Sequence, residues 1–110
     1  MNNRLHLVKN WADWAPQAGY RSQNLARLCQ VSVRQLERFF HKKFKRSPHQ
    51  WLRTARMARA VELLQDGSSV KETATLLGYK AVPHFTRDFK KWSGKSPTSY
   101  VRIHFTPPLA

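Results

Sequence analysis

Apolar residues recur along this chain at spacings of three and four positions, and no stretch alternates strictly between apolar and polar residues. Spacings of three and four place side chains on one face of an α-helix, whereas strict alternation is typical of a β-strand. Glycine and proline are sparse and stand between the periodic segments. The pattern therefore predicts an all-α fold of about seven helices.

The first predicted helix covers about residues 4–14 and ends at a break over residues 16–20, which contain proline and glycine. It begins without a capping residue, and the spacing of its apolar residues directs one face toward a core. The residues predicted on that face are Leu5, Val8 and Trp11, with Leu7 and Trp14 as further candidates.

Serine residues predict the starts of the next two helices. Ser22 is a candidate N-cap, and Ser32 with Gln35 three positions later has the sequence of a capping box. The second of these helices combines an apolar side with a charged one. The apolar positions after Ser22 are Leu25, Ala26, Leu28 and Cys29, and those after Ser32 are Leu36, Phe39, Phe40 and Phe44.

Ser47, Pro48 and Gln50 predict the start of a long helix. Serine suits the N-cap, proline the first helical position, and glutamine the third position of a capping box. The helix stops near Gly67, and apolar residues along it can line packing surfaces. It is therefore predicted to be a rigid connector rather than a flexible linker.

Start and stop signals divide the remaining residues into three shorter helices. Ser69 and Glu72 form a capping box before a short helix that ends at Gly78, a residue suited to a left-handed turn. A longer helix covers about residues 82–92. The terminal helix begins at Ser96, and two prolines in the tail prevent its continuation.

The chain also repeats itself at an offset of 49 residues, which becomes 48 further upstream. Each half contains a short helix, a tight turn and a longer basic helix, the helix-turn-helix arrangement whose second helix enters the major groove. The predicted organisation is a first subdomain over residues 1–46, a connector over 47–66, a second subdomain over 67–104 and a tail over 105–110. The matched pairs include Leu36 with Phe85, Arg38 with Arg87, Phe40 with Phe89, Lys42 with Lys91, Ser47 with Ser96, and Trp51 with Tyr100.

The charge of the chain points to a polyanionic partner. Twenty Lys and Arg against six acids give a formal net charge of +14 on 110 residues, a length that suits one domain or two small helical lobes. A membrane surface is a competing partner, but no apolar run reaches the roughly 18 residues that a span needs. A solvated basic surface without a partner is the third interpretation.

Few residues are suited to catalysis or metal binding. Cys29 is the only cysteine, so the chain has neither an internal disulfide nor a cysteine pair for zinc, and its apolar surroundings predict a core thiol. The histidines lack ligand spacing, and the six acids form no general acid/base pair, so no metal, no cofactor and no enzyme is predicted. A lone cysteine and the absence of a signal-peptide stretch fit a cytoplasmic protein at the nucleoid.

From about residue 22 to residue 102 the chain resembles the DNA-binding domain of the AraC/XylS family of transcription regulators. The second half, with its glycine, aromatic and Ser-Pro spacing, is the more specific signature. The resemblance implies a seven-helix architecture whose connector holds two recognition helices, so that one monomer reads two successive major grooves of an asymmetric site. It rests on Leu25, Ala26, Ser32, Leu36, Arg38, Phe40, Ser47, Pro48, Ala60, Leu63, Leu64, Ala74, Gly78, Tyr79, His84, Phe85, Arg87, Phe89, Gly94, Ser96 and Pro97.

The resemblance also implies base-reading positions on both recognition helices. They are Arg34, Glu37 and Arg38 on the first, and Val82, Pro83, His84 and Arg87 on the second. Arginine can read guanine with two hydrogen bonds, and glutamate can accept one from cytosine. Arg38 and Arg87 could instead hold a phosphate or an acid such as Asp88. The other charged residues could simply be solvated, and His84 could cap or pack.

A further set of residues is predicted to contact phosphates, which positions a protein on DNA without specifying sequence. It comprises Ser32, Lys42, Lys43, Lys45 and Arg46 around the first recognition helix, and Lys80, Lys90, Lys91 and Lys95 around the second. The aromatic residues Phe40, Phe89, Trp51 and Tyr100 are predicted to be core rather than base-stacking residues, because they recur at helical spacing among apolar neighbours.

Three departures from the family pattern concern a turn and the ends of the recognition helices. Gln30 in the first turn and Lys45 after the first recognition helix stand where the family commonly has glycine. If these sites are left-handed, each costs about 1 to 2 kcal/mol. At the second recognition helix, Lys80 and Ala81 offer no capping side chain, and a Val-Pro pair replaces polar residues.

The sequence thus predicts sequence-specific binding of double-stranded DNA and regulation of bacterial transcription. The family resemblance adds activation through contact with RNA polymerase as the common mode. One chain is expected to bind DNA as a monomer, unless it is part of a longer dimeric regulator. The alternative is a non-specific architectural protein that binds DNA or RNA, for which the charge alone would suffice; two matched recognition helices argue against it.

Overall fold

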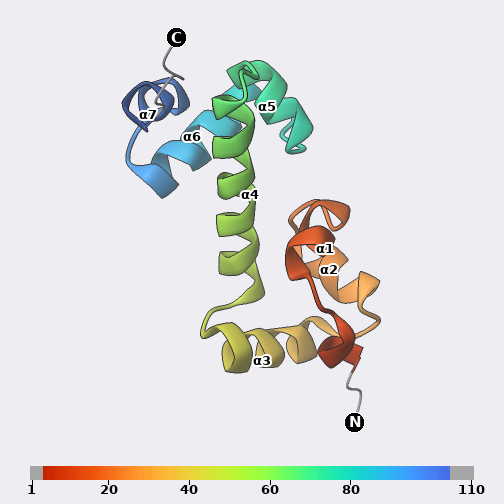
Figure 1. Ribbon diagram of the computed structural model, residues 1–110. Coiled ribbons are helices and arrows are strands. Elements are labelled where there is room, and N and C mark those ends of the chain that lie inside the picture. Colours follow the sequence, from red (N-terminus) through yellow and green to blue (C-terminus); the bar gives the residue numbers. More distant parts are fainter. Residues whose placement is uncertain (1–3, 105–110) are drawn as a thin grey trace. The chain divides into compact units, whose positions relative to one another are not determined.

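The all-α fold predicted from the sequence is confirmed. The computed structural model describes the backbone of residues 4–104 and the side chains of Leu5 and residues 7–101. This part contains one 3-10 helix and seven α-helices and no strand, and none of its helices is long and apolar enough to cross a membrane. The chain divides into two compact units, unit 1 over Met1–Arg56 and unit 2 over Met57–Ala110 (Figure 1).

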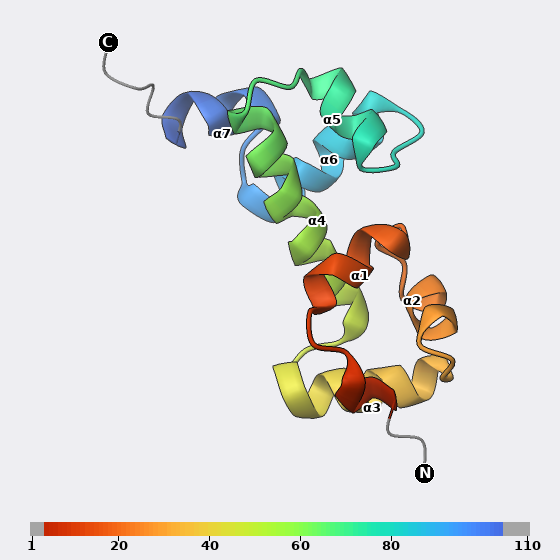
Figure 2. The ribbon, with the colours of Figure 1, turned by 45° about the vertical axis from the view of Figure 1, so that its right-hand side comes forward.

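Each unit is built around a helix that packs against two others. In unit 1, α2 packs against α1 and α3, and in unit 2, α6 packs against α5 and α7 (Figure 2). The division falls within α4, so this helix contributes residues to both units. The elements are η1 (Arg4–Leu7), α1 (Trp11–Gln17), α2 (Ser22–Leu28), α3 (Val33–Phe44), α4 (Pro48–Gln65), α5 (Val70–Leu76), α6 (Val82–Ser93) and α7 (Pro97–His104).

The chain before α2 differs from the prediction. The single helix expected over residues 4–14 is wrong, because η1 is followed by a break and α1 then runs from Trp11 through Pro16 to Gln17. Asn10, directly before α1, has an extended conformation, which separates the two helices. Leu5, Val8 and Trp11 are nevertheless all buried, as predicted.

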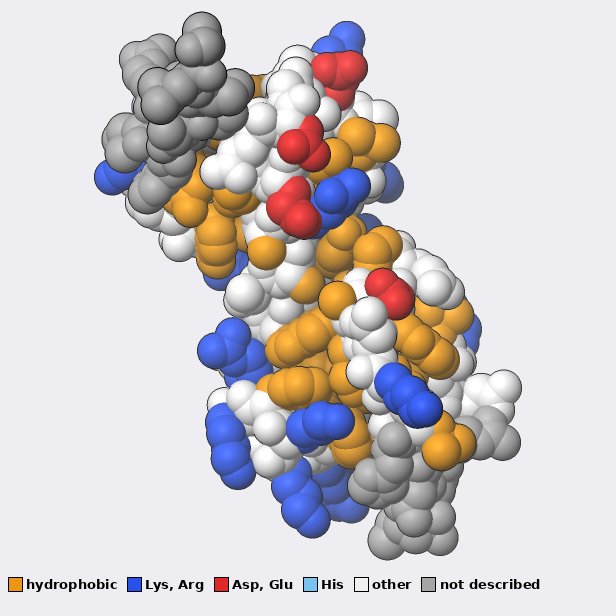
Figure 3. Space-filling model, in the orientation of Figure 1, with side chains coloured by type: hydrophobic (Ala, Val, Ile, Leu, Met, Phe, Trp, Pro, Cys, Tyr) orange, Lys and Arg blue, Asp and Glu red, His pale blue; other side chains and the backbone are white. Residues whose placement is uncertain are grey.

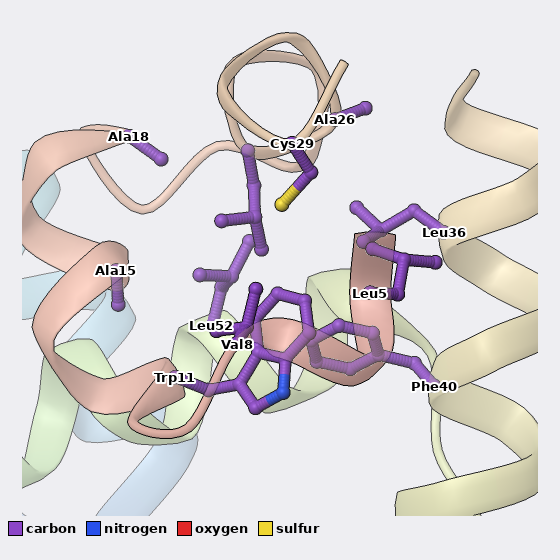
Figure 4. Packing of buried hydrophobic residues seen from close by; sticks show 11 residues of the cluster. Leu5, Val8, Trp11, Ala15, Ala18, Ala26, Cys29, Leu36, Phe40 and Leu52 are labelled. Atoms are coloured by element: carbon purple, nitrogen blue, oxygen red, sulfur yellow. The ribbon is translucent and has the colours of Figure 1, made fainter. Parts of the chain in front are cut away.

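The core of unit 1 forms where α1, α2 and α3 meet the start of α4. Phe40 is fully buried, and the Trp11 ring stands edge-on to it with 4.9 Å between ring centroids (Figure 4). Two predicted core positions are wrong. Leu7 is 76% exposed because Leu5 and Val8 share one face of the 3-10 turn and Leu7 lies off it, and Leu28 at the end of α2 is 42% exposed. The buried residues are Leu5, Val8, Trp11, Ala15, Ala18, Leu25, Ala26, Cys29, Leu36, Phe40 and Leu52.

Cys29 is a core residue, as predicted. Its sulfur points into the cluster of buried side chains, and only 5% of the residue is exposed (Figure 4). Burial raises the pKa of the Cys29 thiol above its ordinary value, since a buried thiolate would lose its hydration. The neutral thiol therefore dominates at neutral pH, and the side chain acts as a small apolar residue.

Four of the predicted helix starts are confirmed and one is wrong. Before α7, Ser99 N–H donates to Ser96 Oγ at 3.2 Å, as expected for an N-cap. Gln35 N–H donates to Ser32 Oγ at 3.1 Å while Ser32 N–H donates to Gln35 Oε1 at 2.9 Å, which completes the capping box of α3. Ser69 caps α5 in the same way, and Ser47 and Gln50 make the reciprocal pair before α4. Ser22 is not an N-cap, because α2 already includes it.

The Ser69 capping box affects the ionisation of Glu72. The Ser69 backbone N–H, followed by the Ser69 hydroxyl, lowers the pKa of the Glu72 carboxyl, because both groups donate to its charged form. This contribution to the stability of unit 2 is complete above the ordinary pKa of a glutamate. It is lost as the pH falls through the lowered pKa.

The core of unit 2 repeats the aromatic packing of unit 1. Phe85 and Phe89 are fully buried, and the Tyr100 ring stands edge-on to Phe89 with 5.3 Å between centroids. Leu76, the last residue of α5, is 66% exposed although it is apolar. The side chain of Ile103 and the tail over residues 105–110 lie outside the described residues.

The internal repeat of the sequence is a repeat of structure. Helices α2 and α5 have 7 residues each and α3 and α6 have 12 residues each, with the starts of each pair at the predicted offsets of 48 and 49 residues. Their capping is reversed between the units. Unit 1 caps α3 with Ser32 but leaves Arg21 before α2 without a side-chain cap, whereas unit 2 caps α5 with Ser69 but leaves Ala81 before α6 without one.

Two residues in unit 1 adopt the left-handed conformation that glycine adopts in unit 2. Gln30 has φ 58° and Lys45 has φ 61°, and the equivalent residues of unit 2 are Gly78 with φ 84° and Gly94 with φ 81°. Gln30 and Lys45 therefore both lie in the left-handed region, where a residue with a side chain is strained. A side chain at such a position costs about 1 to 2 kcal/mol.

Exchanging the residues at Lys45 and Gly94 should move stability in opposite directions. Lys45→Gly relieves the left-handed strain but adds freedom to the unfolded chain, so we expect a net gain of about 0.5 to 1 kcal/mol in the free energy of unfolding. Gly94→Lys should lose a similar amount through its backbone, because nothing lies within 4 Å of an added Cβ. Urea unfolding without DNA measures both; changes of the same sign would contradict the strain argument.

Candidate nucleic-acid interface

Helix α3 separates its apolar and charged side chains onto different faces. Leu36 and Phe40 are buried on the inner face, and the capping box at Ser32 fixes where the helix begins. The exposed residues on the outer face recur at helical spacing and line a shallow hollow. They are Arg34, Glu37, Arg38, His41 and Lys42.

The hollow on α3 is equipped to recognise polar groups. Arg34, Arg38 and Lys42 donate hydrogen bonds, whereas a carboxylate such as that of Glu37 accepts them. In the described part of the chain the ion pair is between Arg59 and Glu62 of α4, at 3.6 Å, so no ion pair occupies the α3 face. All three base-reading residues predicted on α3 therefore lie together on one exposed face.

Helix α6 presents a different face at the equivalent positions. Pro83, Arg87 and Lys91 take the places of Arg34, Arg38 and Lys42, and all three are exposed. His84 is exposed, while Val82 is half-buried at the first position of the helix. Ala81 has an extended conformation and makes no side-chain capping bond, as the sequence predicted. The first turn of α6 thus offers apolar side chains where α3 offers an arginine.

The side chains predicted to contact phosphates are all exposed, but three of them interact with the protein. Lys43 Nζ lies 5.5 Å from the ring centroid of Phe39 and 5.7 Å from that of Phe44. Lys45 Nζ donates to the backbone oxygen of Lys42 at 3.2 Å. Ser32 Oγ accepts the capping hydrogen bond from Gln35 N–H at 3.1 Å. The remaining side chains are exposed and make no such described contact: Lys42 and Arg46 beside α3, and Lys80, Lys90, Lys91 and Lys95 beside α6.

Positive charge is unevenly divided between the units. Unit 1 has twelve Lys and Arg against two acids, whereas unit 2 has eight against four, which gives formal charges of +10 and +4. On the face shown in Figure 3, Lys and Arg side chains gather over α3, and most of the Asp and Glu side chains lie over unit 2. Unit 1 therefore has the stronger attraction for a polyanion.

His41 lies on the exposed face of α3 with Arg38, although it was not among the predicted base-reading residues. The partner of Asp88 was missed from the sequence. The alternative in which Arg87 holds Asp88 is not what the structure shows, because Asp88 Oδ2 accepts a hydrogen bond from the hydroxyl of Tyr79 at 3.0 Å. No ion pair joins Arg87 to Asp88 in the described part of the chain.

In the described part of the chain, no three His, Cys, Asp or Glu residues form a group that could hold a metal ion.

Each unit therefore contains a short helix, a tight turn and a longer helix with an exposed basic face. In unit 1 the turn is closed by Val31 N–H to Ala26 O at 3.0 Å, and in unit 2 by Tyr79 N–H to Ala74 O at 2.9 Å. This arrangement defines the class of helix-turn-helix proteins.

Comparisons with known proteins identify the family. A family model described as a helix-turn-helix domain matches residues 25–103, more than half of the chain. The HTH-type transcriptional regulator GbdR of Pseudomonas aeruginosa is 38% identical over 74 residues, which make up 66% of this chain and 20% of that protein. The C-terminal domain of AraT, a response regulator from Geobacillus stearothermophilus, is 26% identical with a TM-score of 0.75, over 90% of this chain and 86% of that one.

The DNA-binding domain of AdpA, a global transcriptional factor solved in complex with a target DNA, is 27% identical with a TM-score of 0.74, over 94% of both chains. The chain belongs to the AraC-type helix-turn-helix family of transcription regulators, as the sequence predicted. It spans about a fifth of the length of GbdR. Because the family and the similar structures are DNA-binding regulators, the prediction that the chain is not an enzyme is also confirmed.

Proposed function

We propose that the chain binds double-stranded DNA at specific sequences and regulates bacterial transcription, with α3 and α6 as its recognition helices. The observation that carries the proposal is the pair of exposed basic faces at equivalent positions of two helix-turn-helix units. The similarity to the AdpA domain, which was solved with a target DNA, supports it. Such a regulator acts at the bacterial chromosome, in the cytoplasm.

Base recognition is assigned to residues of α3 and α6. On α3, Arg34 and Arg38 can read guanine and Glu37 can accept from cytosine, because these groups are exposed and outside any described ion pair. On α6, Arg87 and His84 can form hydrogen bonds, whereas Val82 and Pro83 can offer only apolar contact, as to a thymine methyl group. The first unit should therefore specify more of the sequence.

The remaining cations are assigned to phosphates. Lys42 and Arg46 near the end of α3, and Lys80, Lys90 and Lys91 around α6, are exposed and carry no described contact that would hold them to the protein. Lys43 and Lys45 are also assigned to phosphates. Their side chains are less free to rotate, because Lys43 contacts the Phe39 ring and Lys45 donates to the backbone oxygen of Lys42. Contacts to phosphates supply affinity and register rather than specificity.

We further propose that one chain occupies both half-sites. Helix α4 is a single helix of 18 residues that contributes to both units, which supports a monomer that reads two major grooves about 34 Å apart along the DNA. Regulation through contact with RNA polymerase is proposed from membership of the family. A longer regulator could form dimers through a domain outside this chain.

The salt dependence of binding tests the proposal. About eight basic residues are assigned to phosphates, so log affinity for duplex DNA plotted against log salt should fall with a slope of several units. A preferred duplex should bind more tightly than a scrambled duplex of equal length, and single-stranded RNA should bind more weakly than either. Equal affinity for all three would favour a non-specific architectural protein instead.

A further inference from the structure

Tyr79 and Asp88 form a polar pair where unit 1 has an apolar one. The Tyr79 hydroxyl donates to Asp88 Oδ2 at 3.0 Å, and both side chains are half-buried. The equivalent residues of unit 1 are Val31 and Phe39, which pack against its hydrophobic core. The hydrogen bond therefore connects the turn of the second helix-turn-helix unit to the middle of its recognition helix.

Asp88 is the only acid on α6, and two basic residues lie within its reach. His84 comes four residues before it and Lys91 three residues after it, the spacings at which side chains meet on a helix surface. Both residues are assigned to DNA under the proposed function. An ion pair between Asp88 and either of them would weaken the attraction of unit 2 for DNA, and this unit already has the smaller positive charge.

The structure directs the Asp88 carboxylate toward Tyr79 instead. Within the described part of the chain, no ion pair joins Asp88 to His84 or Lys91, and both of these side chains are exposed. The Tyr79 ring packs against the fully buried Phe85 of α6, with 5.4 Å between ring centroids. This packing fixes the ring, so the hydroxyl is held in place for Asp88.

We propose that Tyr79 is a positioning residue whose hydroxyl holds the Asp88 carboxylate away from His84 and Lys91, which leaves both side chains available to DNA. The inference rests on the proposed function, because it takes α6 to be a recognition helix. It adds a role for two residues that do not themselves touch DNA. The role is electrostatic, which distinguishes it from a contribution to packing.

The first test is Tyr79→Phe, which keeps the ring on Phe85 and removes only the donor. The released carboxylate should pair with Lys91 or His84, and affinity for a preferred duplex should fall about two- to fivefold, the range for one exposed ion pair. The plot of log affinity against log salt should become shallower by about one unit, because one phosphate contact is lost.

The decisive variant combines Tyr79→Phe with Asp88→Asn. Removing the charge should restore both the affinity and the salt slope to wild-type values, although the hydroxyl is still missing. A role in packing alone predicts that the double variant stays as weak as Tyr79→Phe. Glu62→Gln on the Tyr79→Phe background is the matched control, since it removes an exposed acid of unit 2 that lies on α4, and both deficits should remain.

Unchanged affinity and salt slope in Tyr79→Phe would overturn the inference, as would a deficit that Asp88→Asn does not correct. Both results leave specific binding by the wild-type chain intact. A wild-type chain that fails to prefer its selected duplex over a scrambled one would instead contradict the proposed function. The two failures are therefore distinguishable in the same titrations.

Discussion

Replacing Phe40 by alanine should destabilise unit 1 by about 3 to 5 kcal/mol, the usual cost of deleting a buried aromatic side chain. Phe40 has no exposed surface, and its ring centroid lies 4.9 Å from those of both Trp11 and Phe44 and 5.6 Å from that of Trp51. The substitution leaves a cavity at the point where α1, α3 and α4 meet. Urea unfolding followed by tryptophan fluorescence measures the loss.

The neighbouring Phe39 provides the matched control for Phe40. It lies on the same helix and is only half-buried, so Phe39→Ala should cost clearly less than Phe40→Ala. The equivalent substitution in unit 2, Phe89→Ala, should cost about as much as Phe40→Ala, because Phe89 is also fully buried. Equal losses for Phe39→Ala and Phe40→Ala would contradict the assignment of Phe40 to the centre of the core.

Arg38→Ala should relax base preference in the half-site read by unit 1 by about 1 to 3 kcal/mol. The Arg38 side chain is exposed on the same face as Arg34 and Glu37, where it can donate two hydrogen bonds to one guanine. Affinities for a panel of duplexes, each with one base pair of the preferred site changed, measure the effect. Lys42→Ala, which removes a phosphate contact from the same helix, should weaken every duplex equally.

Arg87→Ala is the counterpart in unit 2 and should act differently. Val82 and Pro83 give the first turn of α6 few hydrogen bonds to bases, which leaves His84 and Arg87 as the polar groups of this face. If Arg87 mainly contacts a phosphate, its loss should weaken binding to all sequences evenly. A half-site under unit 2 as sharply defined as that under unit 1, and blurred by Arg87→Ala alone, would reverse this assignment.

Periodicity and capping predicted most of the fold because both are local properties of the chain. The capping boxes at Ser32 and Ser69 were each predicted from two residues, and both are present. The repeat in the sequence predicted that α3 and α6 are equivalent helices, and the two have the same length. Gln30 and Lys45 stand where the family commonly has glycine, and the left-handed conformation that this raised as a condition is present at both. These inferences required no knowledge of which helices pack together.

Features that depend on packing could not be predicted from the pattern. Leu28 and Leu76 are apolar residues at equivalent positions, yet both are exposed, although Cys29 and Leu77 directly after them are buried. The two leucines therefore lie on the outer side of a turn whose other side is covered by the core. Thr73 is fully buried and its hydroxyl has no hydrogen-bond partner, although its equivalent in unit 1 is the apolar Leu25. The Tyr79 and Asp88 hydrogen bond likewise joins residues nine positions apart through the fold.

The base-reading set remains a prediction, because exposure on a recognition helix is necessary for contact with DNA but does not prove it. Arg34, Glu37 and Arg38 share one face, which agrees with the assignment.

Selection of preferred duplexes from a random DNA pool by the wild-type chain tests the central claim most directly. The proposed function predicts enrichment of two short blocks whose centres are about one helical turn apart, with one block more sharply defined than the other. Enriched duplexes should bind one chain each when the complex is sized by sedimentation. A pool that remains random after repeated rounds would contradict sequence-specific recognition by this chain.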